Sequence, residues 1–408
     1  MLSKHSNVLY ACIISGIALI SCINDFRAIR IIIAAYIITL IVFSSHKNFK
    51  LRFYFANDEE SFFNTILLAI LLSSLTLIGL QKEAIFAALF LVIAHEFRKN
   101  ALWNIAIFTI FGFSFFYLFY MLNNSIEVGK VFFLSLIGAL ASSLVESIKT
   151  QADKRFTVVL AAAATYTIFF IYSINVSILQ LAVAFALSLV LSLAATKAGA
   201  ADESGLMSAT LIGTLIIVST NIKFFAVLLL FYMVGSIVTR YKYSIKLERG
   251  IAEPAGGARG YSNVFGNSLA AMLFAMLYGI NNDFFTLAFV ASVATALGDT
   301  MASEIGKTAK NVYLITSFEK VEAGVNGGIS LIGEIAALIG SFIIVAFALL
   351  LRLIELKWMP IVIFSSFVAI HIDSLLGATL ETKGYLTNSL VNFIATLCAG
   401  LLCYLLFL

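Results

Sequence analysis

The feature that most constrains this chain is a succession of apolar segments, each long enough, or nearly so, to cross a lipid bilayer. Of its 408 residues, 61% are hydrophobic and only 12% are charged. A helix satisfies its own backbone hydrogen bonds in lipid, whereas an isolated strand does not. The period-two alternation typical of membrane barrels is absent from the sequence. We therefore expect an all-α fold, a polytopic transmembrane helical bundle.

About 15 segments are candidate spans. Two of them, 84–96 and 206–220, are short enough to be re-entrant or half-helices. The candidates are 8–24, 29–45, 62–80, 84–96, 101–121, 131–148, 156–174, 177–197, 206–220, 222–239, 263–281, 284–302, 329–351, 358–376 and 386–408.

The distribution of positive charge predicts the orientation. If the N-terminus is cytoplasmic and the sides alternate, most of the 26 Lys and Arg residues fall in cytoplasmic segments. This asymmetry is what the positive-inside rule requires. We expect an integral multi-pass membrane protein whose polar motifs face the cytoplasm, where nucleotides are available.

Acidic residues at the ends of two apolar segments are the first functional candidates. Asp299 and Glu304 lie in one segment, and Asp373, Gly377 and Glu381 follow a spacing of four in another, so they share a helix face. Acids in membrane helices are costly and usually functional. Two such helices could hold Mg²⁺, which binds a few carboxylates together with substrate phosphates and water. Alternatively, these acids are interfacial caps or ion-pair partners of nearby lysines.

The polar loop 240–262 offers groups that suit a phosphate. Gly256 and Gly257 permit close backbone approach, Arg259 can form a bidentate pair, and Lys246 supplies a point charge. Asn263 and Asn267 follow at i and i+4 on the next helix. This amide pair would contact either a nucleotide or a neighbouring helix.

A glycine cluster at 324–328 precedes the segment that starts near residue 329. Such a turn can present free N–H groups to an anion. We expect a phosphate-binding turn that includes Asn326, Gly327, Gly328 and Ser330, with Lys307 from the preceding basic loop. It is not a Walker loop, because no Gly-Lys-Ser/Thr closes it.

Two regions share a pattern of small residues. Residues 138–146 end in Glu146 with Asp153 beyond, and residues 373–381 end in Glu381 with Asn388 beyond. The pattern indicates either an internal duplication or only the common small-residue packing of membrane helices.

From about residue 191 onward the chain resembles the phytyl-phosphate kinase family, integral membrane proteins related to transmembrane protein nineteen. The matching blocks, in family order, are AGAADESGLMSATLIGTL (198–215), GSIVTR (235–240), GGARGYSNVFGN (256–267), ASVATALGDTMASEIGK (291–307), VEAGVNGGISLIGE (321–334) and DSLLGATLE (373–381). The resemblance implies transfer of phosphate from a nucleoside triphosphate, with CTP favoured, to an isoprenyl monophosphate. In photosynthetic organisms this salvages phytol for tocopherol or phylloquinone.

The first half is loosely similar to phytol and dolichol kinases. The similarity lies in Glu96, Arg98 and Lys99, in residues 142–146, and in the pair Asp153-Lys154. Lys154 stands at the position where those kinases have Asn. A Gly-Asp block expected between these motifs is missing. We therefore expect region 1–175 to be a degenerate kinase-like half and region 176–408 to be the catalytic domain.

These patterns together predict a membrane phosphotransferase that makes phytyl or geranylgeranyl diphosphate from the monophosphate. Asp299 and Asp373 would hold Mg²⁺ with support from Glu304 and Glu381, and the basic and glycine loops would hold CTP or another nucleoside triphosphate. We expect the partners to be these substrates and the bilayer, with no nucleic acid. Two alternatives remain: a transporter with midplane acids, or a cytidylyltransferase acting on a lipid phosphate.

Overall fold

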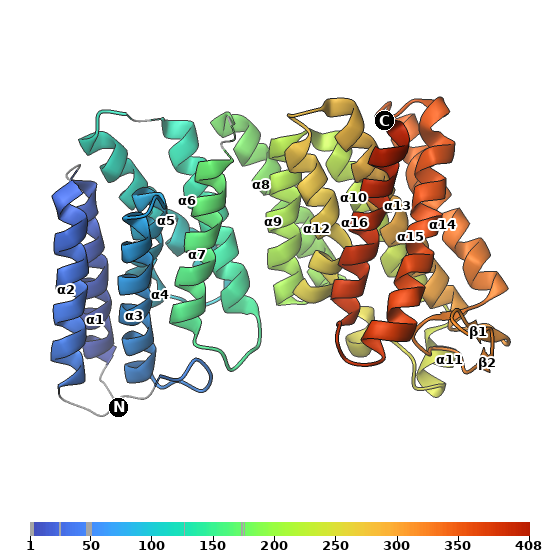
Figure 1. The fold of residues 1–408 in the computed structure, drawn as a ribbon, viewed down its shortest axis with the longest axis horizontal. Helices are drawn as coiled ribbons and strands as arrows, with labels where there is room; N and C mark the ends of the chain where they lie inside the picture. Colours follow the sequence, from blue (N-terminus) through green and yellow to red (C-terminus); the bar gives the residue numbers. More distant parts are fainter. Residues whose placement is uncertain (1–3, 24–25, 46–50, 126, 173, 175) are drawn as a thin grey trace. The chain divides into compact units, whose positions relative to one another are not determined.

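The computed structural model describes residues 4–23, 26–45, 51–125, 127–172, 174 and 176–408 (Figure 1). The chain divides into two compact units, Met1–Val183 and Ala184–Leu408. The expected division after residue 175 falls shortly before α8 (Ile178–Lys197), and the units divide within this helix.

The first unit is a helical bundle. Its most extensive helix–helix contacts are between α5 and α6, α6 and α7, and α1 and α4. The helices are α1 (Lys4–Leu19), the turn η1 (Ile20–Cys22), α2 (Phe26–Ser44), α3 (Asp58–Thr76), α4 (Lys82–His95), α5 (Ala101–Leu122), α6 (Val128–Ser147) and α7 (Lys154–Ile171).

The second unit is a helical bundle with one small sheet. Its helices after α8 are α9 (Glu203–Ser219), α10 (Ile222–Thr239), α11 (Tyr243–Glu248), α12 (Tyr261–Leu277), α13 (Asn282–Gly306), α14 (Leu331–Leu350), α15 (Met359–Leu376) and α16 (Asn388–Phe407). Short turns are η2 (Pro254–Gly257), η3 (Leu356–Trp358) and the π-helical η4 (Gly377–Glu381). The strands are β1 (Val312–Leu314), β2 (Lys320–Val321) and β3 (Gly328–Ile329).

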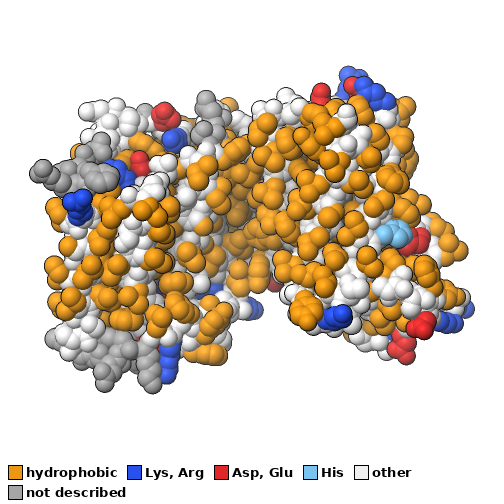
Figure 2. Space-filling model, viewed as in Figure 1, with side chains coloured by type: hydrophobic (Ala, Val, Ile, Leu, Met, Phe, Trp, Pro, Cys, Tyr) orange, Lys and Arg blue, Asp and Glu red, His pale blue; other side chains and the backbone are white. Residues whose placement is uncertain are grey.

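The expected apolar segments all coincide with helices, and the all-α polytopic membrane fold is confirmed. Residue 24 of segment 8–24 and residue 173 of segment 156–174 lie outside the described residues. Within the described part of the chain, nine helices are long and apolar enough to cross a membrane, and Ser6–Cys22, Ala28–Ser44 and Glu203–Ser219 are shorter apolar helices. On the face in Figure 2, hydrophobic side chains cover most of each unit, and most charged ones gather near its ends.

Helix α13 is the centre of the second unit. It contacts α10, α12, α14, α15 and α16, and 83% of the residues in its apolar stretch are buried. Small residues allow this packing: a Cβ at Gly340 of α14 would lie 2.9 Å from the Cα of Gly298. Close backbone approach at small residues is a common way for membrane helices to associate. The crossing fixes the position of Asp299, the next residue along α13.

The sequence did not lead us to expect the sheet after α13. Strands β1, β2 and β3 pair antiparallel in the order β2-β1-β3, with Tyr313 opposite Lys320 and Leu314 opposite Gly328. The sheet lies at the same end of the second unit as α11 (Figure 1). Because β2 and β3 flank residues 322–327, the sheet holds the glycine cluster in place.

Candidate active site

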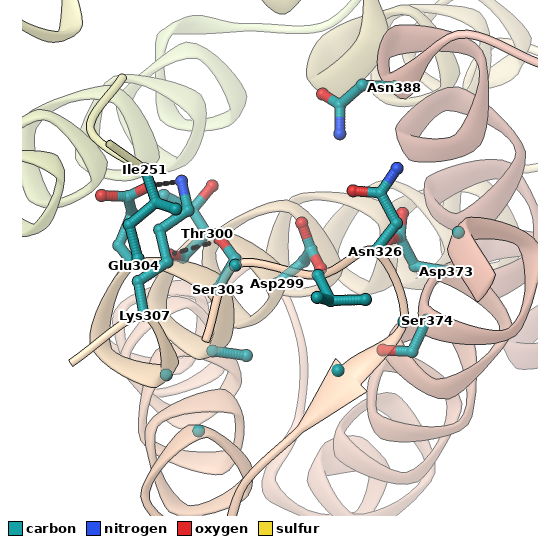
Figure 3. Close-up of a pocket in the computed structure, with 18 of the residues that line it drawn as sticks. Ile251, Asp299, Thr300, Ser303, Glu304, Lys307, Asn326, Asp373, Ser374 and Asn388 are labelled. Carbon is teal, nitrogen blue, oxygen red and sulfur yellow. Dashed lines mark hydrogen bonds and ion pairs between the residues drawn. The ribbon is translucent and has the colours of Figure 1, made fainter. Parts of the chain in front are cut away.

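A polar cavity of about 590 Å³ opens at the end of the second unit where the small sheet and α11 lie (Figure 3). Its walls come from α12, α13, the glycine cluster, α15 with η4, and the start of α16. The structure brings together there twelve of the residues that the sequence predicted for the site. They are Arg259, Asn263, Asn267, Asp299, Glu304, Lys307, Asn326, Gly327, Gly328, Ser330, Asp373 and Glu381.

Three of the carboxylates that line the cavity, those of Asp299, Asp373 and Glu381, come from three different elements. Asp299 comes from α13, Asp373 from α15 and Glu381 from η4. Among the described residues, none of the three forms a hydrogen bond or ion pair, and the Asp373 Oδ2 atom is buried without a partner. Figure 3 shows Asp299 and Asp373 directed into the same space as Asn326 and Asn388. A buried carboxylate without a partner is costly, so this arrangement favours a bound ligand or ion.

The carboxylates do not form a metal site by themselves. Within the described ranges, no group of three or more His, Cys, Asp or Glu residues is close enough to hold a metal ion. Mg²⁺ commonly uses only one or two carboxylates and takes its other ligands from substrate phosphates and water. The free oxygens of Asp299 and Asp373 therefore fit Mg²⁺ that arrives with a phosphate ligand.

The glycine cluster lies against the C-terminal end of α15. Gly327 has a φ of +77°, which favours glycine. The backbone N–H groups of Asn326 and Gly327 donate no hydrogen bond to any described residue. Ser330 caps α14, since its Oγ accepts a hydrogen bond from the N–H of Gly333 at 3.2 Å. The two free N–H groups suit an anion.

Amide side chains of α12 and α16 also line the cavity. On α12, Asn267 Nδ2 donates to the Asn263 carbonyl oxygen at 2.9 Å. Asn388 and Asn392 of α16 also line the cavity, and the sequence did not lead us to either as a site residue. Asn388 and Asn392 have the same i, i+4 amide spacing as Asn263 and Asn267, and this spacing in an otherwise apolar helix is the sequence signal that identifies them.

A cluster of paired charges forms one end of the cavity. Lys307 Nζ lies 2.7 Å from Glu304 Oε1 and 2.8 Å from Glu253 Oε1. Burial alone would raise the pKa of Glu253, but attraction to Lys307 lowers it below its ordinary value. Burial likewise opposes the charge of Lys307, but Glu304 and Glu253 raise the pKa of this ammonium. Glu253 and Lys307 are thus both ionised near neutral pH.

Lys246, expected to contact phosphate, is not among the cavity residues. Its side chain is fully buried, its Nζ donates to the Thr239 carbonyl oxygen at 2.6 Å, and it forms an ion pair with Glu304. The ammonium is already neutralised, so its place in the structure is that of a partner to Glu304. Gly256 and Gly257 also lie outside the lining, and a Cβ at Gly257 would meet the Thr239 side chain at 2.7 Å.

Arg259 is the buried cation that the cavity offers. Its side chain is 9% exposed, and its backbone is held by Ala200 and Asp202. Its guanidinium lies 5.2 Å from the Phe231 ring, and in the described part of the chain it has no ion pair or side-chain hydrogen bond. Burial lowers the pKa of Arg259, although arginine stays protonated at neutral pH. A buried, unpaired guanidinium matches a phosphate ligand.

The motifs of the first unit are arranged differently, because their charges are paired with one another. Glu96 Oε1 lies 2.8 Å from Arg155 Nε. Glu146 lies 3.2 Å from His95 Nε2 and 3.1 Å from Arg98 Nε. These carboxylates therefore contrast with the unpaired Asp299 and Asp373.

The fold and site define a polytopic helical membrane protein with a polar, carboxylate-lined cavity at one end of its second unit. The chain belongs to the integral membrane protein family DUF92, which matches residues 185–400, just over half of the chain. The family expected from the sequence motifs is thereby confirmed. The matched region includes all the cavity residues.

Individual relatives each match about half of the chain. An uncharacterized membrane protein of Methanocaldococcus jannaschii is 31% identical over 227 residues, which cover 55% of this chain and 94% of the relative. An uncharacterized membrane protein of Synechocystis is 34% identical over 194 residues, 46% of this chain and 75% of the relative. The chloroplastic protein VTE6 of Arabidopsis thaliana is 32% identical over 203 residues, 47% of this chain and 61% of the relative. No solved structure matches the chain.

Proposed function

We propose that the second unit is a phosphotransferase of isoprenoid metabolism that converts an isoprenyl monophosphate, such as phytyl or geranylgeranyl phosphate, to the diphosphate. CTP or another nucleoside triphosphate is the donor. The observation that carries the proposal is the group of unpaired carboxylates facing free N–H groups and the buried Arg259 in one polar cavity. The kinase-like sequence motifs between residues 198 and 381 support it, and membership in DUF92 supports its place in a membrane.

In this proposal the cavity divides its work between two kinds of ligand. Asp299 and Asp373 would hold Mg²⁺, with Glu381 beside them, and the free N–H groups of Asn326 and Gly327 would bind the triphosphate. Glu304 contributes by fixing Lys307, which faces the same cavity. Mg²⁺ would neutralise charge on the phosphate oxygens. The cavity opens to the cytoplasm, in keeping with the distribution of positive charge.

The chemistry requires positioning more than proton transfer. An oxygen of the acceptor monophosphate forms a bond to the γ-phosphorus as the bond between this phosphorus and the β–γ bridging oxygen breaks, and its electron pair leaves with the nucleoside diphosphate. The acceptor oxygen is already ionised near neutral pH, so no strong base is needed. Holding two anionic substrates in line, with their repulsion neutralised, lowers the barrier.

A product assay tests the proposal. Purified protein in detergent receives Mg²⁺, CTP and geranylgeranyl phosphate, and separate reactions contain the free prenol. We expect geranylgeranyl diphosphate and CDP in equal amounts, and no product with an Asp299→Asn variant that keeps its elution volume. Phosphorylation of the free prenol would assign the reaction to the first unit. Absence of transfer with every nucleotide would favour the transporter.

A further inference from the structure

A second cavity, of about 370 Å³, lies among α8, α9 and α10 of the second unit. Its lining is almost entirely apolar and includes Leu191, Ile212, Phe225 and Leu229. Along α10 it extends from Phe225 to Ser236, which corresponds to about 16 Å at the rise of an α-helix. The volume is in the usual range for small-molecule sites.

Small side chains create this space. Ala195 of α8 and Gly205 and Ala209 of α9 line it, where larger residues would close it. Helix α8 is highly apolar, and only 22% of the residues in its apolar stretch are buried, as is typical of a helix that borders lipid.

Arg259 connects the two cavities. It lines both the apolar cavity and the polar one. Arg259 is nine-tenths buried, and its guanidinium forms no ion pair with any described residue, although the charges of Glu253 and Glu304 act on it from a greater distance. A buried charge of this kind is expensive unless a counter-ion joins it. The ligand that satisfies both features carries an apolar chain on one side of Arg259 and an anionic group on the other.

We propose that the cavity among α8, α9 and α10 binds the hydrocarbon tail of the isoprenyl phosphate acceptor, and that Arg259 binds its phosphate at the entrance to the polar cavity. This inference rests on the proposed function and assigns the acceptor its own site, separate from the nucleotide. A nucleotide has no group that gains from the apolar lining. A single flexible chain suits a slot between helices better than the paired chains of a bilayer phospholipid.

Filling the cavity tests the tail site. Ala195→Phe and Ala209→Phe place a ring in the lining, and Val190→Phe on α8 is the matched control, because Val190 is 61% exposed and does not line the cavity. We expect the KM for geranylgeranyl phosphate to rise at least tenfold in both cavity variants. The KM for dimethylallyl phosphate, whose tail is short, should change less than twofold, as should both values in Val190→Phe. Equal effects on both acceptors, or none, would overturn the proposal.

Photo-crosslinking separates this proposal from the proposed reaction. A geranylgeranyl phosphate with a diazirine at its tail is irradiated with the full-length protein in the absence of nucleotide. We expect crosslinks in α8, α9 and α10 that are lost in Ala209→Phe. Arg259→Gln should weaken labelling by this probe but not by the corresponding alcohol. Such crosslinks without any phosphate transfer would refute the reaction and leave the site standing. Crosslinks elsewhere, or equal competition by a diacyl phosphatidic acid, would refute the site.

Discussion

Gly327 lies directly against Ser374: a Cβ built at residue 327 would come within 2.6 Å of the Ser374 carbonyl oxygen. It would also lie 2.4 Å from the Cβ of Ala378. Real Cβ atoms do not approach neighbours this closely, so only glycine lets the loop reach α15. This contact brings Asn326 to the wall of the cavity that Asp373 also lines.

The first prediction follows from this contact. Gly327→Ala should displace the loop and lower kcat/KM for the nucleotide at least tenfold. Gly384→Ala is the control, because Gly384 has almost the same φ, +76°, but no atom within 4 Å of a built Cβ. Both variants place an alanine in the left-handed region, which costs about 1–2 kcal/mol. Only in Gly327→Ala does the new methyl group also clash with α15. Equal activity in the two variants would show that the contact with α15 is unimportant.

The second prediction concerns the unpaired acid Asp373. Asp373→Asn keeps the shape of the side chain but removes its charge, and turnover should fall by about 100-fold or more, as when a group that stabilises charge in the transition state is removed. The thermal midpoint in detergent should stay the same or rise, because a buried carboxylate without a partner destabilises the free protein. Asp283→Asn, at an exposed position in the first turn of α13, is the control. A large fall in the midpoint would instead make Asp373 a structural residue.

The third prediction tests the place of Lys246. Lys246→Met leaves Glu304 buried with only Lys307 as its partner, and we expect a loss of stability near the lower end of about 3–5 kcal/mol. The double variant with Glu304→Gln should recover part of this loss, as measured by unfolding in detergent. An unchanged midpoint with a raised KM for CTP would identify Lys246 as the phosphate ligand that the sequence predicted.

The fourth prediction concerns the pH dependence of the pair Glu253 and Lys307. The pair lowers the pKa of Glu253 below its ordinary 4.5 and raises that of Lys307 above 10.5. The contribution of Glu253 to the free energy of unfolding is complete above pH 4.5 and is lost as the pH falls through the pKa of Glu253 in the folded protein. The contribution of Lys307 to the free energy of unfolding is complete below pH 10.5 and is lost as the pH rises through the pKa of Lys307 in the folded protein.

Glu253→Gln measures this effect. The Glu253 side chain is 41% exposed, so we expect a loss of about 1 kcal/mol or less at pH 7. The difference in thermal midpoint between the wild type and the variant should shrink below pH 4. A difference that is the same at pH 7 and below pH 4 would show that the carboxylate charge does not matter.

The helices could be predicted because each depends mainly on its own residues. A long apolar segment in lipid satisfies its own backbone hydrogen bonds only as a helix, and every segment expected to be a helix is helical in the structure. The sheet after α13 could not be predicted in this way. Its strands contain only two or three residues each, and they depend on pairing across the turn rather than on local pattern.

The site could be predicted as a set of residues but not as an arrangement. The spacing of Asp373, Gly377 and Glu381 placed them on one face, yet the nearness of α13 depends on crossings such as Gly298 against Gly340. Lys246 and Arg259 looked alike in sequence as phosphate-binding cations. Only the tertiary structure gives Lys246 a carboxylate partner and leaves Arg259 without one.

The proposed transfer of the γ-phosphate to an isoprenyl monophosphate is tested most directly by tracing two labels in one reaction. CTP labelled separately in the γ-phosphate and in the cytidine is incubated with Mg²⁺, geranylgeranyl phosphate and the purified protein. We predict that the γ label alone enters the lipid, as geranylgeranyl diphosphate, and that the cytidine label released in this transfer is recovered as CDP in equal amount. Entry of the cytidine label into the lipid, with release of pyrophosphate, would contradict phosphate transfer and identify a cytidylyltransferase.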